Sequence, residues 1–207
     1  DRRLSWGARR LLERIPADQW KERLLYHKEL RVRLQAGLAL MISEPTKDNA
    51  REISEMVVEI LGGFISDRDL IDLLRLTQVA LHRSGLEADE VPQLKHAMVA
   101  EFPIGEPTLN RELFRILAYL NGESIIPRAI SYLQSDAPLA ERLHVAMNLR
   151  FFDHEWTAAE RYSIVKFFEE STVADAGSSV PLYVMSVTKD ICSDMPLEEA
   201  RIFVSEG

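Results

Sequence analysis

Apolar residues recur along this chain at the three- and four-residue spacing of α-helices. The clearest stretch runs from residue 48 to 61, where the apolar positions fall at i, i+3, i+4, i+7 and i+8: Ile53, Met56, Val57, Ile60 and Leu61. Asp48 is the expected N-cap and the glycines at 62 and 63 are the expected stop. The pattern predicts a helix over 48–61.

Cap signals define further helices. Ser66 precedes two acidic residues and an apolar stripe that ends in a basic turn before Gly85, which predicts a helix over 66–84. Thr108 is the expected cap of a helix to residue 120, and Ser124 of the next one. A helix is also expected from Pro138 to about residue 150. Thr157 and Glu160 have the spacing of a capping box that begins a helix to about residue 170.

These elements predict an all-α protein. The only concentration of β-branched residues, from Val184 to Ile191, fits a strand or a helix about equally well.

Two internal similarities in the sequence refine the prediction of the fold. Residues 3–12 superpose on 31–40 at an offset of 28, with Arg3 on Arg31 and Trp6 on Leu34, and residues 109–120 superpose on 139–150 at an offset of 30. Such spacing is typical of antiparallel helix pairs stacked as an α-solenoid; the alternative is an irregular helical bundle.

The chain is expected to form a single helical domain over residues 1–207. Residues 86–107 contain an acidic patch and a turn with Pro103, Gly105 and Pro107, so they are the expected junction between two sub-blocks, 1–85 and 108–207. Asp1 stands directly before helical sequence, with neither an initiator methionine nor a signal peptide. We therefore expect the segment to be excised from a longer chain.

Composition narrows the class of protein. The chain has 207 residues, 46% of them apolar, which is enough for a substantial core, and no apolar run approaches the length of a membrane span. The net charge is −8, but residues 1–33 contain ten Lys or Arg against five acids, so they carry +5 and the rest carries −13. An acidic body disfavours nucleic-acid binding. The lone Cys192 excludes an internal disulfide and a CxxCH haem site.

Several segments resemble a known family. Val32–Leu40 is similar to the repeat helix of HEAT-type proteins, written VRxxAAxAL. Three further segments in this order, 1–16, 107–120 and 141–157, resemble the HEAT-like helical region of large secreted proteins of planctomycete-type bacteria. In those proteins a propeller like that of sugar or sorbosone dehydrogenases precedes the region and a c-type haem domain follows it. The resemblance implies a HEAT-like solenoid and an extracytoplasmic location, and it supplies no catalytic residues.

Candidate chemistry is sparse. The five histidines show neither an HxH nor an HExxH pattern, so we expect no metal and no cofactor in this segment. Ser186 and Lys189 have SxxK spacing, which would suit a hydrolase, but the partner motifs of such enzymes are missing. The expected function is a non-catalytic scaffold or protein-interaction module that positions domains of a larger protein, with protein partners. The alternative is an enzyme-associated module of a redox protein with dehydrogenase and cytochrome c domains.

Polar residues interrupt the second repeat. At the offset of 30, His144 stands where Phe114 does, and Arg150 where Leu120 does. Two polar side chains near a core need partners. Glu112 could pair with Arg150 and Trp156 could offer a stacking surface. The four residues are therefore predicted to form either a polar clasp between helices or a site for a ligand or partner.

Overall fold

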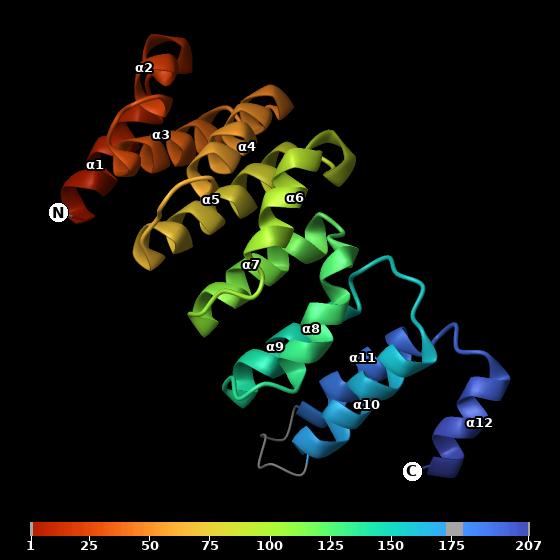
Figure 1. Ribbon diagram of the computed structural model, residues 1–207. Helices are drawn as coiled ribbons and strands as arrows, with labels where there is room; N and C mark the ends of the chain where they lie inside the picture. Colours follow the sequence, from red (N-terminus) through yellow and green to blue (C-terminus); the bar gives the residue numbers. More distant parts are fainter. Residues whose placement is uncertain (1, 173–179, 207) are drawn as a thin grey trace.

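Short helices connected by tight turns make up the structure (Figure 1). The computed structural model describes residues 2–172 and 180–206. Within these ranges there are twelve α-helices, three 3₁₀ helices and no strand, so the predicted all-α class is confirmed. The α-helices are α1 (Arg2–Leu12), α2 (Lys21–Leu25), α3 (Leu30–Ser43), α4 (Lys47–Leu61), α5 (Asp67–Ser84), α6 (Pro92–Glu101), α7 (Pro107–Tyr119), α8 (Ile126–Leu133), α9 (Leu139–Leu149), α10 (Ala158–Thr172), α11 (Val180–Ile191) and α12 (Leu197–Glu206).

Three of the predicted caps are confirmed. The Ser66 hydroxyl accepts a hydrogen bond from the Asp69 amide, and Gly85 ends α5 with φ of 63°, a left-handed conformation that favours glycine. Thr157 and Glu160 exchange the two hydrogen bonds of a capping box at the start of α10.

Other caps were predicted wrongly. Thr46, not Asp48, caps α4, because its side chain accepts from the Asn49 amide. Glu106 takes the place expected for Thr108, since its carboxylate accepts from the Thr108 amide and hydroxyl. Ser124 lies inside the 3₁₀ turn before α8 and makes no cap.

Helices of odd and of even number form two sets. The principal contacts join α1 to α3, α3 to α5, α5 to α7, α7 to α9 and α9 to α11, while α4 contacts α6 and α8 contacts α10. The even helices α2, α4, α6, α8 and α10 also contact the odd helix that follows each of them in the chain. The helices follow one another across the molecule, from α1 at the upper left of Figure 1 to α12 at the lower right. We refer to α1, α3, α5, α7, α9 and α11 as the odd layer.

Small residues of α3 allow its neighbours to approach closely. Ala36, Gly37 and Ala39 of α3 are all buried. A Cβ atom added to Gly37 would lie 2.8 Å from Leu76 Cδ2 and 3.0 Å from Ile53 Cδ1. Gly37 therefore allows α3 to contact α4 and α5 at the same position.

The hydrophobic core continues through the predicted junction at 86–107. This segment holds α6, and Leu86, Leu94, Met98 and Phe102 are buried in the same cluster as the helices on either side. Phe102 packs against Phe114 of α7, with ring centroids 5.2 Å apart, and Phe114 in turn packs against Phe152. The junction is thus a helical element, and the core of the described residues continues through it. The segment 184–191, which fitted a strand or a helix, belongs to α11.

Candidate interaction surface

Glu112 and Arg150 do not pair, so this part of the predicted clasp is wrong. Glu112 is in the first half of α7, whereas Arg150 is the C-cap of α9. At the offset of 30, Arg150 corresponds to position 120, eight residues beyond Glu112. Eight residues of helix separate them by about 12 Å along the helix axes.

The Glu112 carboxylate faces α5 instead. It accepts hydrogen bonds from Gln78 at 2.9 Å, Arg115 at 3.0 Å and Arg75 at 3.3 Å. Burial alone would raise the pKa of Glu112, but these donors outweigh it, and the pKa is lowered. Glu112 is therefore an ionised link between α5 and α7.

Arg150 links α9 to α11. Its guanidinium lies 3.3 Å from the Asp190 carboxylate, donates to the Ser186 hydroxyl at 3.0 Å and stacks 4.9 Å from the centre of the Phe151 ring. The Ser186 hydroxyl is thus a hydrogen-bond acceptor for Arg150, and it makes no hydrogen bond to Lys189 in the described ranges. This geometry does not favour the hydrolase pairing of Ser186 and Lys189.

His144 and Trp156 have separate surroundings. His144 of α9 is half-buried, its Nε2 lies 3.4 Å from the Asn148 amide nitrogen, and burial, with the nearby charge of Arg115, lowers the pKa of the imidazole. Trp156 lies in the connection before α10, where its ring meets the edge of His154 at 4.9 Å between centroids. The four predicted residues therefore do not converge on a single site.

What the sequence prediction missed is a row of ion pairs along the odd layer. Four arginines each reach an acid on the next odd helix. The pairs are Arg31–Asp69, Arg75–Glu112, Arg111–Glu141 and Arg150–Asp190. Arg111 and Glu141 make two hydrogen bonds of 2.6 Å, and Glu141 is 7% exposed. Two of these pairs contain a residue singled out from the sequence, Glu112 and Arg150, but neither partner was predicted, because the acids stand at no fixed spacing from the arginines.

The odd layer also holds a groove of about 720 Å³ that crosses α1, α3 and α5. Four arginines and one acid line it, together with an exposed tryptophan and two aliphatic side chains. The charged members are Arg9, Arg31, Arg68, Arg75 and Asp72, and the apolar ones are Trp6, Leu34 and Ile71. A smaller hollow continues from Trp6 and Arg9 to Arg10 and Arg14. We refer to the groove across α1, α3 and α5 as the arginine groove.

The even helices form the opposite layer, and it has a smaller hollow in which the cations are paired with an acid. Between α4 and α6 it measures about 340 Å³ and is lined by Arg51, Glu55, Glu90 and Leu94, among others. Lys47 and Arg51 each hold a Glu90 oxygen at 2.6 Å, and the hydrogen bond from Lys47 is the main cause that lowers the pKa of Glu90 to about 2. Lys47 and Arg51 therefore already pair with Glu90 at this hollow.

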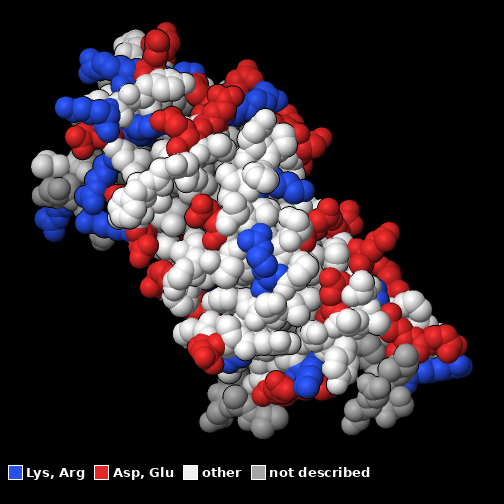
Figure 2. Space-filling model, viewed as in Figure 1, with Lys and Arg blue, Asp and Glu red and all other residues white. Residues whose placement is uncertain are grey.

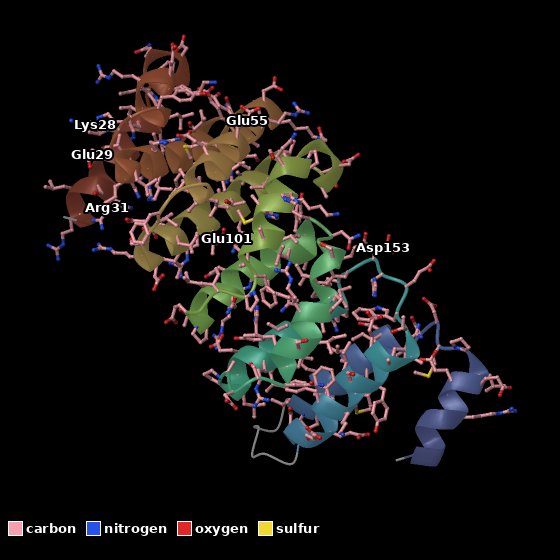
Figure 3. All side chains as sticks on the ribbon, in the orientation of Figure 1. Lys28, Glu29, Arg31, Glu55, Glu101 and Asp153 are labelled. Atoms are coloured by element: carbon pink, nitrogen blue, oxygen red, sulfur yellow. The ribbon has the colours of Figure 1, made fainter. Side chains whose placement is uncertain are left out.

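The surface charge follows the uneven sequence. On the face shown in Figure 2, Lys and Arg gather around the N-terminal helices and acidic residues follow the right-hand margin. The central area is mostly uncharged, with one blue side chain near its middle. Figure 3 places Arg31 beside α1, close to Lys28 and Glu29, and Glu55 on α4.

Within the ranges described, no cluster of His, Cys, Asp or Glu could hold a metal ion. None of the helices there has the length and apolar character needed to cross a bilayer.

Comparison with family models, with curated proteins and with solved structures gave no significant match. The functional argument therefore depends on the geometry of this chain.

Proposed function

We propose that this chain is a non-catalytic helical-repeat module that binds protein and positions the domains of a larger extracytoplasmic protein. In this proposal its helix pairs stack as a HEAT-like solenoid. The observation that carries it is the order of helix contacts: the principal ones join helices no more than two places apart. A stack of repeats, in which each unit contacts only its neighbours, has this order.

The extent of the surface also supports a stack. The accessible surface is 11930 Å² for a chain of 23.7 kDa. A compact folded monomer of this mass exposes about 9,800 Å². An irregular bundle closed around one core should have an accessible surface near the lower value. An extended stack should have a larger one.

Exposed apolar side chains give such a module places to bind neighbours. On α1, Leu4 and Leu11 are 73% and 63% exposed, and on α11, Leu182 and Met185 are 70% and 69% exposed. Apolar patches of this kind are typical of protein-binding surfaces. We propose that these two helices contact flanking domains.

Site-specific photo-crosslinking tests the proposal. A photoreactive amino acid would replace one exposed residue at a time in cells of the source organism: Asp72 and Arg115 on the odd layer, Glu55 and Gln93 on the opposite layer. We expect protein adducts from at least one layer. If all four positions, and further positions across both layers, gave no adduct with another domain or protein, the interaction role would be overturned.

The redox alternative implied by the family resemblance makes a separate prediction. The gene would then encode a propeller before this segment and a CxxCH motif after it. Repeats that continue in both directions would instead support a plain adaptor. Sequencing of the complete gene separates the two.

A further inference from the structure

We propose that the arginine groove binds an acidic segment of a partner protein, with carboxylates three residues apart along an extended backbone. This inference deepens the proposed function and rests on it. Three features of the groove indicate the chemistry of the partner. They are the spacing of its arginines, the hydrogen-bond donors that these arginines keep for a ligand, and its apolar lining.

The groove repeats the same positions on neighbouring helices. Arg31 is the second residue of α3 and Arg68 the second residue of α5, and an aliphatic side chain follows each by three positions, Leu34 and Ile71. Trp6 is the corresponding residue of α1 at the offset of 28. The cationic position is therefore repeated on α3 and α5, and the apolar position on α1, α3 and α5.

The spacing of these positions matches one peptide conformation. Packed helices lie about 8–10 Å apart, so the arginines at this position on neighbouring helices are separated by about that distance. A polyproline II strand rises about 3.1 Å per residue with three residues per turn, which places every third side chain on one side at intervals of about 9 Å. Carboxylates at every third residue would therefore meet successive arginines.

The guanidinium groups retain donors for such a ligand. Arg68 makes no ion pair with any residue that the structure describes. Arg31 reaches Asp69 only through Nε at 3.4 Å, and its side chain is 62% exposed. Arg75 donates to one Glu112 oxygen through Nε at 3.3 Å and Nη2 at 3.4 Å, and its side chain is 57% exposed. Exposed pairs of this length are weak, and a ligand carboxylate can replace them with shorter, charge-assisted hydrogen bonds.

The apolar positions provide a second contact. Trp6 is 59% exposed on α1, and Leu34 lies buried in the floor between the arginines. Aromatic and aliphatic side chains arranged in this way bind the proline rings of extended peptides. Charge alone would attract any polyanion, whereas these apolar positions select a peptide.

Fluorescence anisotropy of a labelled peptide tests the inference on the full chain. The probe is a fluorescein-labelled twelve-residue peptide of four Glu-Pro-Pro units. Two comparison peptides keep its length: one has Gln in place of Glu, and the other has its four glutamates adjacent at one end. We expect the probe to bind, the Gln peptide not to bind, and the clustered peptide to bind more weakly. Binding should weaken as the salt concentration rises.

Substitutions locate the binding site. Arg68→Ala and Arg31→Ala should each weaken binding about tenfold, the loss expected for one charge-assisted hydrogen bond. Arg68→Glu should weaken it further. Arg23→Glu is the matched control, because Arg23 is exposed on α2, outside the groove, and carries the same change of charge. Thermal melts of each variant show that the fold is kept.

Three outcomes would overturn the inference. The first is no binding of the Glu-Pro-Pro probe, and the second is equal loss in Arg23→Glu and Arg68→Glu. The third is tighter binding of a labelled single-stranded DNA of twelve nucleotides, which would assign the groove to nucleic acid. Crosslinks from other surfaces would leave the proposed function standing in each case, so the two failures are distinguishable.

Discussion

Gly37 is the residue at which the packing of α3 is most restrictive. An added methyl group would lie 2.8 Å from Leu76 Cδ2, and both neighbouring side chains are buried and cannot move away freely. We expect Gly37→Ala to lower the free energy of unfolding by about 1 kcal/mol, because overpacking exceeds the gain in helix propensity.

Gly7→Ala is the matched control. Gly7 lies inside α1 with nothing within 4 Å of an added Cβ. The same substitution should therefore stabilise the chain by about 0.5–1 kcal/mol. Chemical denaturation of both variants gives the comparison. Equal stabilisation at both positions would contradict the close approach of α3, α4 and α5.

Arg150 is expected to contribute modestly to stability. Its partner Asp190 is about half exposed, so the ion pair itself is weak, and packing on Phe151 adds the remainder. Arg150→Ala should cost about 1–2 kcal/mol in thermal melts. Lys189→Ala, on the same helix α11, is the control and should change stability by less than about 0.5 kcal/mol. A loss as small for Arg150 as for Lys189 would show that its contacts to α11 contribute nothing.

At this scale the sequence indicated which polar residues approach the core but not their partners. The offset of 30 marked His144 and Arg150 because apolar residues occupy the equivalent positions. Arg150 indeed bonds across to another helix, but its partner is 40 residues later on α11. Partners on neighbouring helices depend on helix register, which periodicity alone does not fix.

Among the elements, α12 depends most on one side chain. The Arg161 side chain of α10 is 7% exposed; it donates to the Ile191 carbonyl at the end of α11 and to both Glu199 oxygens of α12, each at 3.1 Å. Arg161→Ala would leave the half-buried Glu199 carboxylate without its cation. We expect the local stability of α12 to fall by about 3 kcal/mol.

Hydrogen exchange measured by mass spectrometry resolves this effect. In Arg161→Ala, amides of α12 should lose protection while α3 to α7 keep theirs, because their contacts are unchanged. Arg201→Ala is the control, since Arg201 is exposed and pairs only with Glu198 one turn away. Loss of protection throughout the chain would instead mean that α12 unfolds together with the core.

The existence of the elements could be predicted better than their ends. Apolar periodicity identified the helix at 48–61 and cap signals identified those at 66–84 and 157–170, and all three are present. The errors fell on caps, where any oxygen-bearing side chain within a few residues can accept the free amides. Thr46 and Glu106 did so in place of Asp48 and Thr108. At 184–191, packing of α11 against α9 and α10 favours helix over the strand that composition allowed.

For the whole molecule, the superposition of residues 3–12 on 31–40 pointed to part of the arginine groove. It aligned Trp6 with Leu34, which both line the groove on adjacent helices. Arg68 and Ile71 of α5 could not be added from the same offset, because α5 begins 37 residues after α3 and no fixed period relates them. Because the connections between the helices differ in length, a single offset does not relate all of them.

Small-angle X-ray scattering tests the central claim, that the helix pairs stack into an extended solenoid. A compact domain of 207 residues has a radius of gyration of about 17 Å. Six odd helices side by side at 8–10 Å spacing should give about 20 Å or more, with a pair-distance distribution that has a long tail. A monomer with a radius near 17 Å and a symmetric distribution would contradict the stack and favour the irregular bundle.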